Sequence, residues 1–282
     1  MTELNYDVYV APPIPLDPAA GIAPPDGSPA AWSPLSSTLI YGRTEALLVD
    51  PPITRAQGTA VAEWAGRFGR RVTTVYVTHA HGDHWFATAE IAAAFPGARV
   101  VTTQGVIDTM HALTPGGRRA AFWDALFPGL IGDTAIVAEP LSGELAVDGH
   151  PVLPIETGHS DLDNSTVLHV PSLDLVVAGD VIYNRVHSYL AEAGDGGLEA
   201  WLAAVERIAA LHPRAVVAGH KDAARGDEPS AIDDTRRYLE TAAAVLAQQS
   251  TRREYFDRMT AAFPSWLNPT IAWLSAVRLF AD

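Results

Sequence analysis

The feature that most constrains this chain is a cluster of metal-ligand side chains directly after a short apolar run. His79, His81, Asp83 and His84 lie within six residues, and residues 75–77 before them read V-Y-V. Such a run indicates a buried strand, and the alanine-rich residues 86–95, stopped by Pro-Gly, predict a helix. The cluster is therefore expected on a strand-to-helix loop. Without cysteine, imidazole and carboxylate are the ligands that zinc accepts, so the H-x-H-x-D-H spacing favours a metal site over a histidine-rich surface loop.

Further ligands are expected at the ends of three later apolar runs. Each run closes on a glycine that is followed by one ligand-type residue, and these pairs are Gly158-His159, Gly179-Asp180 and Gly219-His220. Glycine allows the backbone to turn sharply and to approach a crowded centre. The near-identity of V-V-A-G-D and V-V-A-G-H indicates two related halves.

With these residues in this order, residues 36–222 resemble the metallo-β-lactamase superfamily of metallohydrolases. The resemblance implies an α/β fold, a four-layer αβ/βα sandwich with the metals at one edge, between two sheets. Carried over by position, it implies one metal site made of His79, His81 and His159. It implies a second site made of Asp83, His84 and His220, with Asp180 as the carboxylate that bridges the two metals. Asp161 has no place in this scheme, and its replacement by Asn is expected to matter little.

The segment after Asp180 is expected to leave the site as a loop. Tyr183 matches the placement of a tyrosine that assists the substrate carbonyl in the N-acyl homoserine lactonase branch, although simple packing is the alternative. His187, further along the loop, is a weaker candidate for the substrate pocket. Asp83 is expected both to bind metal and to orient the nucleophile.

Composition and charge narrow the class of protein. With 48% hydrophobic residues and a mean hydropathy near zero, the chain reads as globular, with no apolar run near the length of a membrane span and no signal-peptide pattern. No cysteine is present, which makes a cytoplasmic location the default expectation. The net charge is −14, and the scattered arginines form no basic tract, which argues against nucleic-acid substrates.

The chain is expected to form a single domain over residues 1–282 with three added segments. Residues 1–35 read as a proline-rich arm, either purely structural or forming a dimer arm or a pocket wall. Residues 104–140 read as a helical cap insertion that the residues 114–117 divide, with Phe122, Trp123 and Phe127 facing a substrate. Residues 229–282 read as a helical C-terminal extension that serves as a lid or as a dimer surface.

The ligand set and the resemblance together predict a dinuclear zinc-dependent hydrolase. Two Zn²⁺ ions sharing a water would give hydroxide near neutral pH, which attacks an ester-type carbonyl. Iron or manganese at one or both sites is the alternative. A lactone or thioester is favoured, because true metallo-β-lactamases usually lack an aspartate at the position of Asp180.

Several alternatives to a lactonase or thioesterase stay open at this point. They are β-lactamase or phosphodiesterase activity at the same site, a mononuclear iron dioxygenase and, least favoured, a non-catalytic binding protein. A small-molecule substrate is the expected partner, with no nucleic acid and no membrane. A homodimer remains open.

Overall fold

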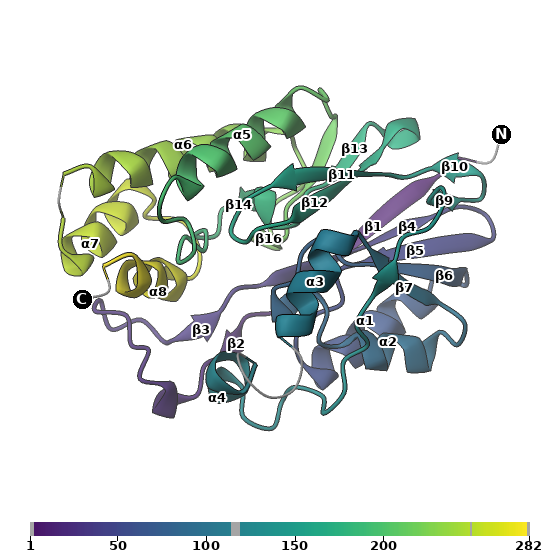
Figure 1. Ribbon diagram of the computed structural model, residues 1–282, viewed down its shortest axis with the longest axis horizontal. Coiled ribbons are helices and arrows are strands. Elements are labelled where there is room, and N and C mark those ends of the chain that lie inside the picture. The colour runs from purple at the N-terminus through teal and green to yellow at the C-terminus, as the bar shows by residue number, and fades with distance from the viewer. Residues whose placement is uncertain (1–2, 114–118, 249, 281–282) are drawn as a thin grey trace.

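Two β-sheets lie face to face in the computed structural model, which describes residues 3–113, 119–248 and 250–280 (Figure 1). The first sheet mixes antiparallel and parallel pairs, and its order along the sheet is β1-β4-β5-β6-β7-β8. β4 and β5 pair as an antiparallel hairpin. The arm expected over residues 1–35 contains the first strand, which the sequence does not predict. The strands are β1 (Asn5–Ala11), β4 (Leu35–Tyr41), β5 (Glu45–Val49), β6 (Arg71–Tyr76), β7 (Arg99–Thr102) and β8 (Glu139–Pro140).

The second sheet takes its strands from the second half of the chain, in the order β11-β12-β13-β15. Three short ladders join segments outside the main sheets: β2 with β3, β9 with β10, and β14 with β16. The main strands are β11 (Leu153–Gly158), β12 (Ser165–Val170), β13 (Leu175–Val177) and β15 (Ala215–Val217). The short strands are β2 (Ile14–Pro15), β3 (Ala31–Trp32), β9 (Ala146–Val147), β10 (His150–Pro151), β14 (Tyr183–Asn184) and β16 (His220–Lys221).

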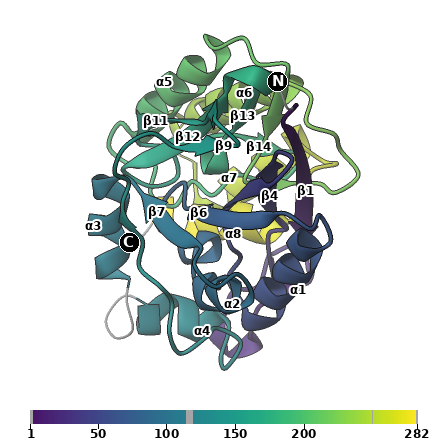
Figure 2. The same ribbon diagram turned by 90° about the vertical axis from the view of Figure 1, so that its right-hand side faces the viewer.

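Apolar side chains fill the space between the sheets and cover both outer faces. Ile40, Leu47 and Val49 of the first sheet share one buried cluster with Leu168 and Val177 of the second. Helices α1 (Arg55–Gly66) and α2 (Thr88–Ala94) cover the outside of the first sheet, and α5 (Gly197–Ala209) and α6 (Ser230–Leu246) cover the second. Figure 2 shows the resulting order of helices, sheet, sheet and helices. The expected four-layer αβ/βα sandwich is confirmed.

The helices form where the sequence supplies caps and apolar stripes. Thr54 and Gln57 make a reciprocal capping box at the start of α1. In α5, Trp201, Val205 and Ile208 recur at helical spacing and all are buried.

Both segments that the sequence assigns to added helices contain helices. The insertion contains α3 (Gln104–Ala112) and a π-helical turn, Arg119–Trp123, that runs into the short α4 (Asp124–Leu126). The break expected at residues 114–117 lies outside the described residues. The extension continues from α6 into α7 (Arg252–Ala262) and α8 (Pro269–Leu279), and α8 packs beside β3 of the N-terminal arm (Figure 1).

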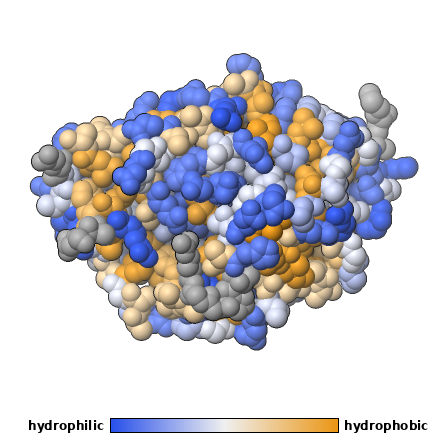
Figure 3. Space-filling view, viewed as in Figure 1, coloured by the Kyte–Doolittle hydropathy of each residue, from blue (hydrophilic) through white to orange (hydrophobic). Residues whose placement is uncertain are grey.

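Two surface properties bear on partners. Among the helices of the described residues, none is both long and apolar enough to cross a membrane. Hydrophobic residues gather on the left of the face in Figure 3, over the region where α7 lies in Figure 1.

The packing of α5 generates a stability prediction. Trp201 is fully buried, and its indole nitrogen donates to the Val181 carbonyl at 2.9 Å. Trp201→Ala should lower the free energy of unfolding by about 3–5 kcal/mol, because it leaves a large cavity. Urea denaturation of the metal-free protein measures this, with the half-buried Trp273→Ala as the control. A loss below about 1 kcal/mol in Trp201→Ala would contradict the packing described.

Candidate metal centre

The histidine cluster lies on the loop between β6 and α2, as the sequence predicts. The chain leaves the strand at Tyr76 and forms a single 3-10 turn at Gly82–His84 before the helix begins. A Cβ atom on Gly82 would collide with the Phe86 ring, so this tight turn requires glycine. The turn holds Asp83 and His84 in the interior, where both are buried.

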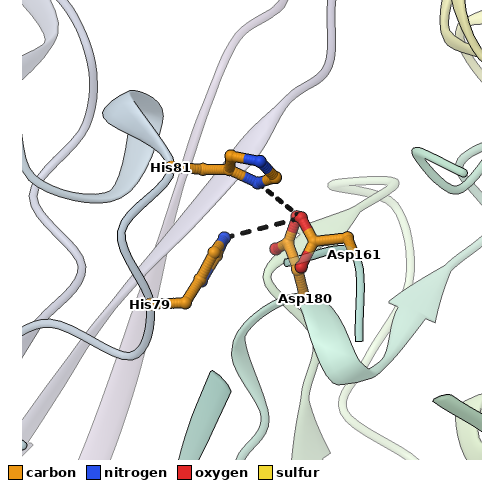
Figure 4. Close-up of side chains that lie close together, drawn as sticks. All are labelled: His79, His81, Asp161 and Asp180. Carbon is orange, nitrogen blue, oxygen red and sulfur yellow. Dashed lines mark hydrogen bonds and ion pairs between the residues drawn. The ribbon is translucent and has the colours of Figure 1, made fainter. Parts of the chain in front are cut away.

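One group of ligand-type side chains contains His79, His81, Asp161 and Asp180. All four are buried, and one nitrogen or oxygen atom of each lies within 4.8 Å of those of the others. The Oδ2 atom of Asp161 is 2.6 Å from Nδ1 of His81 and 3.5 Å from Nε2 of His79. Figure 4 shows both imidazoles pointing at Asp161, with Asp180 beside it.

The second group contains Asp83, His84 and His220, all buried and again within 4.8 Å of one another. Asp180 touches this group as well as the first. Its Oδ1 atom lies 3.2 Å from Nε2 of His84, and its Oδ2 atom lies 3.1 Å from Nε2 of His220. Asp180 therefore stands between the two groups, where the sequence places a bridging carboxylate.

His159 lies outside both groups, which differs from the sequence expectation. Its Nδ1 atom is 2.7 Å from the Asp163 carboxylate, and its Nε2 atom lies against Gly197 at the start of α5. The pairing of β11 with β12 shifts register between Glu156 and Gly158, and Gly158 has φ of 89°. The chain bends there, and the side chain that reaches the centre is that of Asp161. The expectation that Asp161 is unimportant therefore does not fit this geometry.

The outward-facing nitrogen of each histidine in the two groups has a partner. Such contacts fix the orientation of a ligand ring and leave the other nitrogen facing the centre. Asp50 also accepts hydrogen bonds from the backbone N–H and the hydroxyl of Thr78, so it is itself held firmly. The contacts are His79 Nδ1 to Thr78 Oγ1 at 3.1 Å, His81 Nε2 to Glu192 Oε1 at 3.5 Å, His84 Nδ1 to Asp50 Oδ2 at 3.0 Å and His220 Nδ1 to the Pro34 carbonyl at 2.8 Å.

The inward-facing atoms fit a metal. Nε2 of His79, Nε2 of His84 and Oδ1 of Asp180 are buried and make no hydrogen bond of normal geometry in the described structure, although the last two atoms are 3.2 Å apart. Nε2 of His159 is in the same state outside the two groups. Buried polar atoms are seldom left in this state, because losing water without a replacement partner is costly. Divalent cations at the two groups would satisfy the three atoms that lie within them. The donors are nitrogen and oxygen with no thiolate, a set that suits zinc and also manganese or iron.

Electrostatics in the centre keep the carboxylates ionised. Burial alone would raise the pKa of Asp161, yet the neighbouring histidines lower it to about 2. Burial likewise opposes the charged form of His220, but Asp180 and Asp83 raise its pKa to about 10. In the protein without metal, protons on the imidazoles balance the buried carboxylates, and a bound cation would take over that role.

The centre opens into a cavity of about 470 Å³. Phe122 and Trp123 line it, as the sequence predicts, whereas Phe127 is not among the lining residues and packs against Trp32 at 6.0 Å between ring centroids. His187 also lies elsewhere. It is buried with Nδ1 3.1 Å from the Tyr238 hydroxyl, and burial lowers its pKa to about 4.

Tyr183 lines the pocket, but its hydroxyl already makes a hydrogen bond within the protein. It donates to Oδ2 of Asp180 at 2.6 Å, and the ring stacks on His220 with centroids 5.3 Å apart. In this arrangement Tyr183 holds the central carboxylate in place and does not point a free hydroxyl at a substrate carbonyl.

Trp32 was not singled out from the sequence, although it is the one tryptophan in the proline-rich segment. Its indole nitrogen donates to Oδ2 of Asp83 at 2.7 Å. Its ring meets Trp123 edge-on, with centroids 5.1 Å apart, and lines the cavity. The N-terminal arm is therefore a wall of the pocket and a support for one ligand.

Comparison with known proteins identifies related folds. Residues 30–220 match the family model of the metallo-beta-lactamase superfamily. Among solved structures, a metallo-beta-lactamase family protein from Thermus thermophilus aligns at TM-score 0.61 and 21% identity, over 96% of this chain and 93% of that one. A metallo-beta-lactamase from Pontibacter korlensis aligns at TM-score 0.60 and 15% identity, over 85% and 99%. One from Pseudomonas aeruginosa in a mono-zinc form aligns at 0.56 and 14%, over 86% and 96%. No curated protein sequence matches the chain.

The positions of Asp161 and His159 generate a paired test. Asp161→Asn should reduce the metal bound per chain and lower activity by orders of magnitude, because it removes a charged donor from the first group. His159→Gln should leave both within about twofold, because that ring lies outside the groups. Elemental analysis after dialysis at fixed zinc concentration measures the first quantity. The opposite pattern would restore His159 as the ligand.

Trp32 generates a second prediction. Trp32→Phe keeps an aromatic ring in the wall but removes the hydrogen bond to Asp83, so affinity for the metal at the second group should fall about 10- to 100-fold. Zinc titration with a competing chelator measures this. Trp123→Phe is the control, since Trp123 makes no hydrogen bond to a ligand in the described structure. Equal zinc affinity in Trp32→Phe and the unmodified protein would remove the supporting role.

Proposed function

The chain belongs to the metallo-beta-lactamase superfamily of metal-dependent hydrolases, and on that premise we propose that it is a dinuclear zinc enzyme that hydrolyses a small carboxylic ester, a lactone or a thioester. One observation carries the proposal. Buried nitrogen and oxygen ligands form two adjacent groups that share contact with Asp180, and both groups open into one pocket.

The ligands divide naturally between two cations. His79, His81 and Asp161 would hold one, while Asp83, His84 and His220 would hold the other, with Asp180 between them. Zinc bound there would acidify water toward neutral pH and polarise a substrate carbonyl.

The protein's own side chains keep this centre in one geometry. The Tyr183 hydroxyl fixes Oδ2 of Asp180, and the Trp32 indole fixes Oδ2 of Asp83. Both bonds are buried, so they are made once on folding and need no rearrangement during turnover. The first keeps the shared carboxylate aligned, and the second holds the Asp83 oxygen that lies 3.4 Å from Nε2 of His220.

The pocket supports a small ester over a nucleic acid. A cavity of about 470 Å³ lies within the range typical of small-molecule sites. Its apolar wall is made largely of Trp32, Leu113, Phe122 and Trp123, which suit an apolar acyl group. A phosphodiester backbone demands clustered cationic residues, and the described lining contains a single arginine and no lysine.

The proposal is tested by metal analysis and a substrate screen. Protein purified without chelator should contain about two zinc ions per chain, and it should cleave chromogenic lactones or thioesters in preference to β-lactams and phosphodiesters. Removing metal should abolish turnover, and zinc should restore it. Asp180→Asn should lower kcat by several orders of magnitude, while the exposed Asp163→Asn should not. One iron with no second metal would favour the dioxygenase alternative.

A further inference from the structure

We propose that Arg278 and Tyr189 form an anion-binding subsite in the pocket, and that the natural substrate carries a carboxylate remote from the bond that is cleaved. This rests on the proposed function for the cleaved bond and adds the chemical class of the rest of the substrate. The subsite lies where α8 and the segment after β14 meet the cavity.

Arg278 is a cation without a carboxylate partner among the residues that the structure describes. It projects from the last turn of α8, and among the described lining residues it is the single arginine or lysine. Its guanidinium lies over the Phe122 ring, 5.8 Å from the centroid, and no ion pair joins it to another described residue. A ring face attracts the cation but takes up none of its N–H groups in ordinary hydrogen bonds. Those groups are therefore free to bind a ligand in the cavity.

Tyr189 supplies a second unpaired donor on the same wall. Its ring packs against His81 and Trp32, with centroids 5.5 and 6.2 Å away, and its hydroxyl has no hydrogen-bond partner among the described residues. Burial and the nearby Glu192 raise the pKa of this phenol above its usual value, so the hydroxyl remains a donor at neutral pH.

A hydrogen bond joins the two segments that carry these donors. The amide of Leu190, next to Tyr189, donates to Oγ of Ser275 at 2.9 Å. Ser275 stands three residues before Arg278 on α8, so the two residues project from neighbouring parts of one helix surface. The segment that carries Tyr189 is thus fixed to the helix that carries Arg278.

A carboxylate is the group that this pair fits best. A planar guanidinium can bind both oxygens of a carboxylate through parallel N–H groups, and a phenol can donate to one of them. The molecule carries a net charge of −14, so its general field repels anions, and an anionic substrate needs a local cation to bind. Trp32 and Trp123 line the same cavity, so an apolar spacer between the carboxylate and the cleaved bond would contact aromatic side chains.

The test compares two esters that differ only in the remote group. One is the mono-4-nitrophenyl ester of adipic acid with its free carboxylate, and the other has that carboxylate converted to a primary amide. In the zinc-loaded enzyme, Arg278→Met should raise KM for the carboxylate ester roughly tenfold and change KM for the amide ester less than about twofold. Arg278→Lys, which keeps the charge at the end of α8, should give an intermediate value for the carboxylate ester. Tyr189→Phe should raise KM for the same ester by a smaller factor.

Arg237→Met is the matched control. Arg237 also lies over an aromatic ring, that of Phe263 at 5.4 Å, but it does not line the cavity. Its replacement should leave both KM values unchanged. Thermal unfolding of every variant separates a loss of binding from a loss of fold.

A second readout does not depend on turnover. The mono-anilides of the same acid and amide resist hydrolysis, and their Kd follows from the fluorescence of Trp32 and Trp123 in the pocket wall. The acid anilide should bind more tightly, and Arg278→Met should remove that preference. Equal effects of Arg278→Met on acid and amide ligands, or none, would overturn the subsite. If neither ester is cleaved but the anilides show the preference, the subsite stands and the proposed hydrolase function fails.

Discussion

The structure depends on the burial of three carboxylates in two adjacent groups of side chains. Asp83, Asp161 and Asp180 are all inside the protein, and Asp180 makes close contact with histidines of both groups. Like charges buried near one another repel strongly in a medium of low dielectric constant. The buried carboxylates are stabilised because imidazoles lie beside them, and bound cations would offset their charge further. Folding and metal binding are therefore expected to support each other.

The sandwich brings the ends of strands from both halves of the chain to one edge, and the histidines and carboxylates meet there. The approach is so close that two positions exclude a side chain. A Cβ atom on Gly219 would collide with the Asp180 carboxylate, and one on Gly179, where φ is 48°, would meet Thr78. The short β14–β16 ladder sets Tyr183 beside His220. The two glycines and the two-residue ladder thus allow an approach of the backbone that larger side chains at the glycine positions would block.

The pocket has a different origin from the metal centre. Its walls come from the N-terminal arm through Trp32, from the insertion through Phe122 and Trp123, and from the extension through Arg278. These segments lie far apart in sequence and meet around the sheet edge. A shared hydrolytic centre can therefore serve different substrates when the added segments change. Trp32 links the two parts, since one side chain both holds Asp83 and forms the wall.

The residues alone were enough to predict the strand-to-helix loop and most of the ligand-type side chains, whereas the sandwich followed from the resemblance to the metallo-β-lactamase superfamily. His79, His81, Asp83 and His84 are close in the chain, and a ligand directly after a strand-ending glycine needs no long-range information to reach the sheet edge. Asp180 and His220 follow such glycines, and the structure brings both to the centre.

The choice between His159 and Asp161 required the folded chain. Both follow the same strand, and the choice depends on the register shift before Gly158 and on the packing of the His159 ring against α5. The partners of Trp32 and Tyr183 depend on the fold in the same way. A hydrogen bond between residues 32 and 83 exists because two distant segments fold together, and strand periodicity carries no record of that contact.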